Sequence, residues 1–212
     1  MSNRRNVLQQ IVVGTVAVTG MAGCLRLSDD GQSDSEQDGG EPEQSRAEQT
    51  GEESTSQVAD TINVVGEVGT VSDSAITQAT LTVQRAPGSG EVDLTDLAIQ
   101  FVGADGSATL VHVSAADGNA ATYGVETVTA ATEDAVITDD SDRYQLVIPL
   151  SDTGVTVADA GTGSSEQLRS GGLEPLQAGE SAELTITTAS DATRTVFIQV
   201  PDTLGDSDTV AL

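Results

Sequence analysis

Cys24, the one cysteine of the chain, is the residue whose setting most clearly suggests chemistry. It directly follows Ala22-Gly23, and an apolar run from Ile11 to Val18 lies ahead of it. A cysteine behind small residues at the end of such a run resembles a lipobox, where the signal is removed and the new first residue carries a lipid. We therefore expect Cys24 to be the lipidated N-terminus of the mature protein.

Two arginines, Arg4 and Arg5, precede this apolar run and are followed by Val7-Leu8. A charged start, an apolar middle and a small-residue cleavage site make up an export signal, and paired arginines resemble the twin-arginine type that exports folded proteins. We assign residues 1–23 to this signal. A transmembrane helix or a buried free cysteine are the alternatives, but Val7 to Gly23 falls short of the roughly 20 apolar residues that span a bilayer.

Three further places hold side chains of the types that perform chemistry. His112 is the only histidine, and its position between Val111 and Val113 turns it to the opposite face of a strand. It has no Asp, Glu or Cys within three positions, so we expect an exposed or half-buried histidine without a catalytic or metal-binding role.

The acidic run Asp139-Asp140-Ser141-Asp142 could offer oxygens to Ca²⁺, but it lacks the spacing of an EF-hand loop, so a solvated turn is the simpler interpretation. Asp142 and Arg143 could form an ion pair.

The charge balance excludes several classes of function. The 212 residues contain 34 acidic and 8 basic residues, with a net charge of −26, and every basic residue is Arg. Such a chain repels phosphate backbones, so nucleic-acid binding is excluded. With one Cys and one His, we expect no catalytic residue, no metal site and no cofactor. Acid excess without lysine indicates adaptation to concentrated salt, where a screening length of about 3 Å suppresses repulsion within the fold.

After the signal, the chain divides into two segments of different composition. Residues 24–50 are predicted to be a disordered acidic tether, because Ser28 to Glu53 holds Ala47 as its only hydrophobic side chain and cannot offset the entropy of ordering. Residues 51–212 form a second segment. There, short runs of Val, Ile, Leu and Thr alternate with turn signals, a pattern typical of an all-β domain.

Two hairpins illustrate this pattern. Residues 98–102 and 108–113 flank a turn that contains Asp105-Gly106, and residues 183–188 and 193–200 flank Ser190-Asp191. Alternation predicts that several apolar pairs and triplets point inward: Leu81 and Val83; Leu146, Ile148 and Leu150; Leu184 and Ile186; Val196, Ile198 and Val200. We predict seven to ten strands in an antiparallel, Ig-like β-sandwich.

The second segment also resembles a known family, the archaellins or archaeal flagellins of haloarchaeal type. Residues 51–58 followed by Ile62-Asn63-Val64-Val65-Gly66 are similar to the stretch where the filament-core helix of archaellins ends and their outer domain begins. The likeness continues in the family's order along the chain: Leu81-Thr82-Val83, Ala86-Pro87-Gly88, Val92-Asp93-Leu94, Ser141-Asp142-Arg143-Tyr144, residues 176–180, residues 200–204 and residues 210–212.

This resemblance implies a β-sandwich outer domain, no enzymatic activity and a structural role in the archaellum, the filament that moves the cell. Other archaellins or a surface-layer protein are the implied partners, with the membrane reached through the lipid and no small-molecule substrate. The likeness ends before Gly51, where archaellins carry an apolar helix and this chain carries the acidic tether. A lipid-anchored protein that binds the surface layer or an archaellum stator protein is the alternative, and a solute or ion binder is a third.

Overall fold

The computed structural model describes residues 61–132, 134–152, 154–205 and 207–212. The signal over residues 1–23, the tether over residues 24–50 and the candidates Arg4, Arg5 and Cys24 lie outside these residues. Most strands belong to one large sheet, whose spatial order is β12 (Thr193–Gln199), β11 (Ser181–Thr187), β4 (Ala98–Gly103), β5 (Ser107–His112), β6 (Thr122–Thr129), β8 (Arg143–Pro149), β2 (Ala75–Arg85), β1 (Ile62–Ser72) and β13 (Thr209–Ala211).

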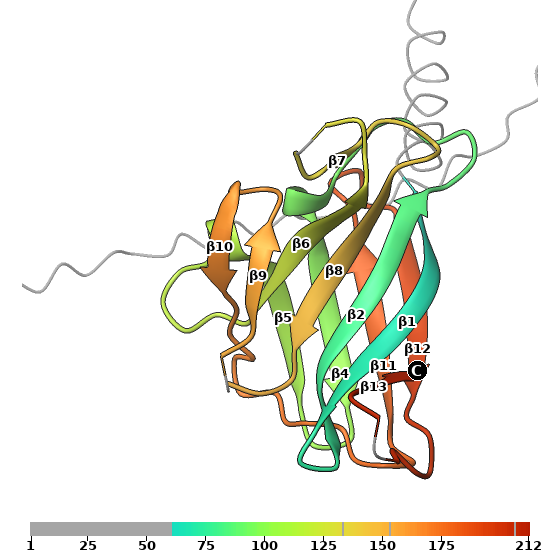
Figure 1. The fold of residues 1–212 in the computed structure, drawn as a ribbon. Coiled ribbons are helices and arrows are strands. Elements are labelled where there is room, and N and C mark those ends of the chain that lie inside the picture. The colour runs from blue at the N-terminus through green and yellow to red at the C-terminus, as the bar shows by residue number, and fades with distance from the viewer. Residues whose placement is uncertain (1–60, 133, 153, 206) are drawn as a thin grey trace, which may run out of the picture. The chain divides into compact units, whose positions relative to one another are not determined.

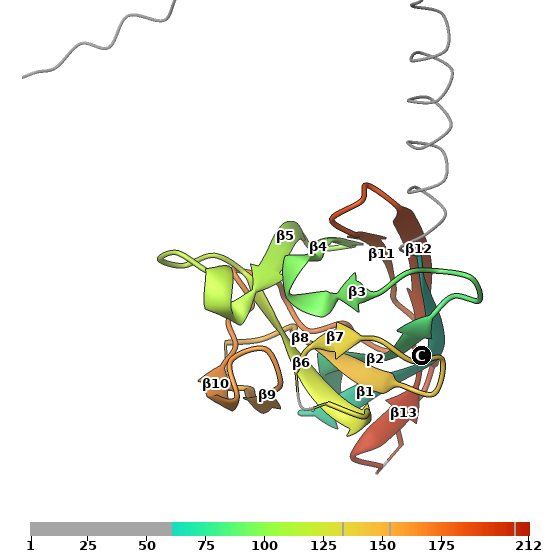
Figure 2. The same ribbon diagram turned by 90° about the horizontal axis from the view of Figure 1, so that it is seen from above.

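The large sheet curls on itself into two layers that face each other (Figures 1 and 2). Strands β12, β11, β4 and β5 form one layer, and β6, β8, β2, β1 and β13 form the other. The layers are joined where β5 runs parallel to β6, with Val111 opposite Thr122 and His112 opposite Tyr123. We call this short parallel pairing the seam. The predicted β-sandwich is confirmed, although one of its strand pairs is parallel.

Smaller elements close the ends of the sandwich. Two short strands, β3 (Val92–Asp93) and β7 (Val136–Ile137), pair with each other, as do β9 (Thr156–Asp159) and β10 (Ser164–Gln167). Two single turns of 3-10 helix follow β3 and β5: η1 (Leu94–Asp96) and η2 (Val113–Ala115). The described part of the chain thus contains thirteen strands. The prediction of seven to ten holds for the nine-stranded sheet and misses the short pairs.

The core lies between the two layers and is built from alternate residues of the long strands. Every member of the inward-facing sets predicted by alternation is buried, on β2, β8, β11 and β12 or at the residue directly after β8 or β12. Phe101 and two tyrosines, Tyr123 and Tyr144, add the large side chains. The hydroxyl of Tyr123 donates to the backbone oxygens of Leu94 at 2.7 Å and Leu97 at 3.0 Å, so its polar end is satisfied inside the core.

The hairpin turns follow local chemistry, with one exception. The β4–β5 turn closes with a hydrogen bond from the Gly103 N–H to the Gly106 oxygen at 2.8 Å, as its Asp-Gly sequence predicts. The β1–β2 turn consists of Asp73 and Ser74, whose φ angles are 51° and 65°. Both angles are positive, as a two-residue hairpin of matching twist requires, although neither residue is glycine. The sequence of this turn therefore lacks the glycine that usually marks a two-residue hairpin.

Acidic residues are nearly absent from the large sheet. Its nine strands contain three carboxylates, Glu67, Glu126 and Glu183, and three arginines, Arg85, Arg143 and Arg194. The sheet is therefore electrically balanced in a chain whose net charge is −26. The excess acids of the described residues lie in turns, loops and the short strand pairs. In the part of the chain that the structure describes, no helix has the length and apolar character to cross a bilayer.

Candidate functional site

His112 lies at the seam, and its surroundings differ from those expected. As predicted, it points to the face opposite Val111 and Val113, but that face is the interior, and its exposed fraction is 0%. Its Nε2 is 3.0 Å from Oδ2 of Asp159, a residue at the end of β9. The expectation of an exposed or half-buried side chain is therefore wrong. The sequence around His112 gives no sign of this partner, because Asp159 is 47 positions away.

Asp159 connects several elements. Its Oδ2 also accepts the backbone N–H of Val125 on β6 at 2.8 Å, and its Oδ1 accepts that of Thr162 at 2.8 Å. Burial acts to raise the pKa of Asp159, but the hydrogen bonds from His112, Val125 and Thr162 outweigh it and lower the pKa from its usual value. One carboxylate therefore ties β5, β6 and the β9–β10 hairpin together.

The other ring nitrogen of His112 faces Ser114. The Ser114 N–H points at Nδ1 from 3.3 Å, and the Ser114 hydroxyl lies 2.8 Å from the same nitrogen. A backbone N–H can only donate, so Nδ1 is the acceptor and the proton of a neutral ring resides on Nε2, where it is donated to Asp159. His112 is thus the N-cap of η2 as well as the partner of Asp159.

Ser114, His112 and Asp159 have the residue types of a hydrolytic triad, but their arrangement favours a structural role. The hydroxyl meets Nδ1 and the carboxylate meets Nε2, the reverse of the usual triad. Ser114 sits two residues from the histidine and contributes a backbone N–H to the same nitrogen, as a helix cap does. The pocket beside Asp159 is not lined by Ser114. The three side chains hold the seam together.

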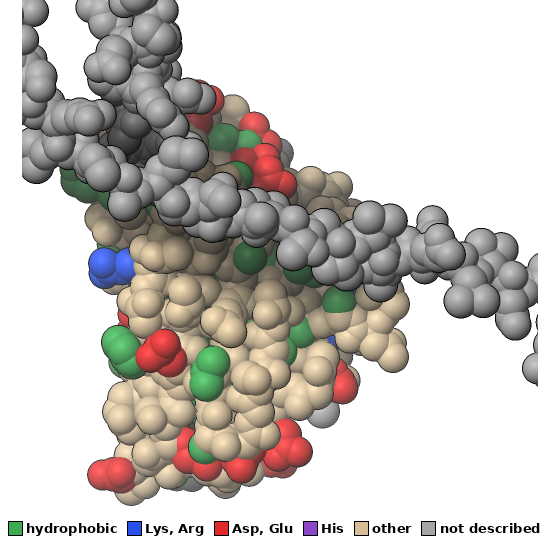
Figure 3. Space-filling view, turned by 180° about the vertical axis from the view of Figure 1, so that it is seen from behind, with side chains coloured by type: hydrophobic (Ala, Val, Ile, Leu, Met, Phe, Trp, Pro, Cys, Tyr) green, Lys and Arg blue, Asp and Glu red, His purple; other side chains and the backbone are tan. Residues whose placement is uncertain are grey.

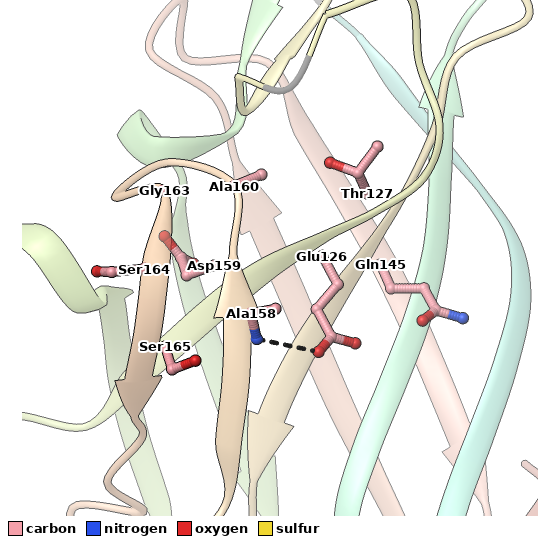
Figure 4. A pocket seen from close by; sticks show the side chains of 9 residues that line it. All are labelled: Glu126, Thr127, Gln145, Ala158, Asp159, Ala160, Gly163, Ser164 and Ser165. Atoms are coloured by element: carbon pink, nitrogen blue, oxygen red, sulfur yellow. Dashed lines mark hydrogen bonds between the residues drawn. The ribbon is translucent and has the colours of Figure 1, made fainter.

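That pocket has a volume of about 530 Å³ and opens between β6, β8 and the β9–β10 hairpin (Figure 4). Ser164 and Ser165 lie on one side, and Glu126, Thr127 and Gln145 lie on the other. The Glu126 carboxylate accepts the Ala158 N–H at 3.4 Å. Its lining has two carboxylates and no basic or aromatic side chain. Such a lining offers little apolar surface to a small organic ligand.

The acidic run on the loop before β8 forms a structured turn. Asp142 is only 1% exposed, and its Oδ2 accepts the Thr138 N–H at 3.0 Å, the Thr138 hydroxyl at 3.2 Å and the Asp139 N–H at 2.9 Å. Burial acts to raise the pKa of Asp142, yet the hydrogen bonds with Asp139 and Thr138 lower it overall. The expectation of a solvated turn is therefore wrong for Asp142, because the backbone of its own loop takes the place of water.

The ion pairs of this loop also differ from those expected. Arg143 does not pair with the Asp142 carboxylate; its Nη1 donates to the backbone oxygens of Asp140 and Asp142, both at 2.7 Å. Asp140 instead accepts from Nε of Arg85, at 3.0 Å. Within residues 61–132, 134–152, 154–205 and 207–212, no group of three or more His, Cys, Asp or Glu side chains is placed to hold a metal ion.

A large uncharged surface covers the outside of the layer formed by β12, β11, β4 and β5. Alternation turns these side chains outward: Ala98, Gln100, Val102, Ser107, Thr109, Val111, Ser181, Glu183, Thr185, Thr187, Thr193, Thr195, Phe197 and Gln199. We call this surface the neutral face, because Glu183 is its only charged member. In Figure 3 the visible part of this face is mostly tan with a few green side chains, and most red side chains lie toward the two ends of the molecule. Phe197, 71% exposed, is its most prominent side chain.

Comparison with known proteins relates this chain to one family. Residues 43–211 match the family described as archaeal-type flagellin. Flagellin A2 of Halobacterium salinarum is 33% identical over 172 residues, which are 80% of this chain and 78% of that protein. Flagellin B1 of Natrialba magadii is 31% identical over 174 residues, 80% of this chain and 79% of that protein.

Solved structures show the same fold at lower identity. The archaeal flagellin FlaB1 of Methanocaldococcus jannaschii aligns with a TM-score of 0.51 and 12% identity, covering 71% of this chain and 94% of that one. The archaeal flagellum of Methanospirillum hungatei aligns with a TM-score of 0.51 and 14% identity, covering 80% and 81%. The family match includes nearly all described residues, and it confirms the resemblance on which the sequence analysis relied. The chain belongs to the archaeal-type flagellin family.

Proposed function

We propose that this chain is a non-enzymatic structural protein of the archaellum, displayed outside the cell and held at the membrane by a lipid on Cys24. The observation that carries the structural role is the family match over residues 43–211, which takes in the whole described β-sandwich. Its relatives are named flagellins, and other archaellins are therefore the expected partners.

The side chains of the sandwich support a role without catalysis. The histidine is buried and committed to Asp159 and η2, and the pocket beside it is polar, without a basic or an aromatic residue. Catalysis of hydrolysis needs a nucleophile that substrate can reach and donors for the developing charge. The hydroxyl and the N–H of Ser114 both contact Nδ1 of His112, so Ser114 is not arranged as a nucleophile.

The segment ahead of the β-sandwich supports the lipid anchor. A filament held by bundled helices needs an apolar face on every subunit, but residues 28–53 contain one alanine as their only hydrophobic side chain. The apolar run of the chain lies before Cys24, and lipobox processing would remove it. The β-sandwich would then follow an acidic tether that is attached to the membrane through the lipid on Cys24.

The neutral face favours a second candidate, a lipid-anchored protein that uses the same sandwich to bind the surface layer or an archaellum stator protein. The two candidates differ in where the protein is found. Electron microscopy of isolated filaments from cells with a tagged copy separates them, since a filament component decorates the filament along its length and a surface binder does not. Purified native chain that formed long helical filaments in molar salt would contradict the lipid-anchored account.

The anchor is tested with Cys24→Ser. This change should move the protein from the membrane fraction to the culture medium, because the thiol that accepts the lipid is gone. The matched comparison is the Arg4→Lys, Arg5→Lys variant, which should reduce surface levels, because lysine lacks the rigid fork of donors of arginine. A Ser variant as firmly membrane-bound as the wild type would rule out the anchor, and normal surface levels of the double Lys variant would rule out twin-arginine export.

A further inference from the structure

We infer that the neutral face is a contact surface for a second copy of this chain, and that Phe197 is the main side chain buried in this contact. Phe197 lies on β12, the last strand of the large sheet, and its ring is exposed to 71%. The other phenylalanine, Phe101, is exposed to 2%. An exposed aromatic on a well-formed strand loses the stabilisation of burial unless a partner covers it.

Phe197 belongs to a row of side chains that crosses three strands. Glu183 on β11 is paired with Phe197 on one side and with Val102 on β4 on the other. Val102 is itself 45% exposed. A shallow groove of about 360 Å³ lies along this row, with Phe197 and Val102 among its lining residues. Two apolar side chains with a groove between them form a site that a matching protein surface can fill.

Charge indicates what kind of surface fits there. A surface that binds a basic partner would carry many carboxylates. Although the chain is rich in acids, this face carries hydroxyl, amide and methyl groups and one carboxylate, Glu183, so it does not suit a basic partner. The acids nearest in sequence lie beyond the ends of the strands: Asp105, Glu180 and Asp202 at one end, and Asp96 and Asp191 at the other. Two copies of so acidic a chain repel each other least where both surfaces are neutral, and this face provides such a place on each copy.

Arg194 lies outside this face. It is paired with Ile186, whose side chain is buried, so alternation turns Arg194 to the other side of β12 from Phe197. In a two-fold contact, each residue of one copy meets the symmetry-related patch of the other. A two-fold axis that runs along the strands between Thr185 and Thr195 sets β11 of each copy against β12 of the other. The Glu183 carboxylates of the two copies then lie on opposite sides of the axis, each at the level of Phe197 of the other copy.

The size of the face suits a modest interaction. Four strands of six or seven residues measure about 19 by 23 Å, so two faces in contact would bury on the order of 900 Å², at the low end for specific interfaces. Display on a membrane raises the effective concentration of such a weak pair. Membrane display rests on the proposed lipid anchor, whereas the contact between the two faces does not.

The contact is tested on intact cells with Thr195→Cys, which places a thiol near the proposed axis. Oxidation should give a disulfide-linked dimer of the full chain. The wild type, with Cys24 alone, controls for the native thiol, and Thr127→Cys, an exposed threonine on β6 in the opposite layer, controls for random collision. A Thr195→Cys dimer no more abundant than either control overturns the proposal, as does a cross-link to a different protein.

The same contact is measured on detergent-solubilised full chain by sedimentation equilibrium in molar KCl. The wild type should show a monomer–dimer equilibrium, and Phe197→Asp should weaken it at least roughly tenfold by burying a charge. Val128→Asp is the matched control, since Val128 is 53% exposed, lies on β6 and receives the same charge. Equal dimerisation of the two variants, or a monomeric wild type, overturns the proposal. Because sedimentation needs no lipid, failure of the anchor and failure of the contact are distinguishable.

Discussion

Strand β5 separates two regions that use polar and apolar side chains in opposite ways. On its inner side, at the seam, His112 and Asp159 are fully enclosed and hydrogen-bonded. On its outer side, the neutral face leaves Phe197 and Val102 in solvent. Among the described residues, no buried side-chain nitrogen or oxygen lacks a hydrogen-bond partner.

The difference between these regions separates stability from interaction. A buried polar group contributes to the fold only while its partners remain, and removing one partner leaves the others unsatisfied in a low dielectric. An exposed aromatic contributes little to the folded monomer, because its surroundings are the same in the unfolded chain. Substitutions at the seam should therefore change the free energy of unfolding, and substitutions on the neutral face should change association.

The largest expected effect is that of Asp159→Ala. It leaves the N–H groups of Val125 and Thr162 and the Nε2 of His112 without their acceptor, so the free energy of unfolding should fall by about 3–5 kcal/mol. Denaturant titration in molar salt measures the loss. Asp117→Ala, an exposed carboxylate, is the control and should stay near the wild-type value. A loss below about 1 kcal/mol for Asp159→Ala would mean that the seam is not a stabilising region.

A smaller effect is expected from Gly161→Ala, which tests how closely the seam is packed. A Cβ on Gly161 would lie 2.6 Å from Cγ2 of Thr95 and 2.7 Å from Cε1 of His112. Because these side chains must move to admit a methyl group, the variant should lose about 1–3 kcal/mol. Gly106→Ala is the control, since nothing lies within 4 Å of its Cβ. Thermal unfolding of the two variants side by side checks this, and equal melting temperatures would contradict tight packing.

The pH dependence of stability should also be traceable to Asp159. Its pKa in the folded protein is lower than the reference value of 3.8, so its contribution is present above that pH and is lost as the pH falls through the folded pKa. Asp159→Asn removes this titrating group. The variant should be less stable than the wild type at neutral pH, and the difference should shrink as the pH is lowered below about 4. A constant difference across that range would assign the acid sensitivity to other groups, such as Asp142.

The smallest effect on folding is expected on the neutral face. Phe197→Ser should change the free energy of unfolding of the monomer by less than about 0.5 kcal/mol, because the ring is already in solvent. By comparison, truncation of the buried ring by Phe101→Ala should cost about 3–5 kcal/mol. Chemical denaturation at low protein concentration compares the two. If the two losses were similar, Phe197 would be a core residue and the contrast between the regions would not hold.

The elements that were predicted correctly from sequence are those set by patterns among residues close together in the chain. The β4–β5 hairpin follows from alternation and an Asp-Gly turn, and the inward sets such as Leu81 with Val83 follow from the two-residue period of a strand. The β1–β2 turn was missed because Asp73 and Ser74 adopt positive φ without a glycine to signal it. The short pairs β3–β7 and β9–β10 were missed because two to four residues show little periodicity.

The candidate site residues divide in the same way. Arg4, Arg5 and Cys24 could be proposed from sequence because export and lipidation signals are contiguous stretches, and they remain predictions outside the described residues. Asp159 was missed, because the residues around a buried carboxylate do not indicate which distant side chain it will contact.

For this chain, the sequence by itself determined where long strands such as β4, β5, β11 and β12 form, how side chains alternate along them, and the placement of most acids outside the large sheet. These are local properties, because backbone geometry alternates side chains with a period of two. Only the tertiary structure decided which strands become neighbours. It joined β5 to β6 in parallel, enclosed His112 with an aspartate 47 positions away, and set Phe197, Glu183 and Val102 side by side on one surface. Pairing of distant strands depends on how the whole core packs, which no short window of sequence contains.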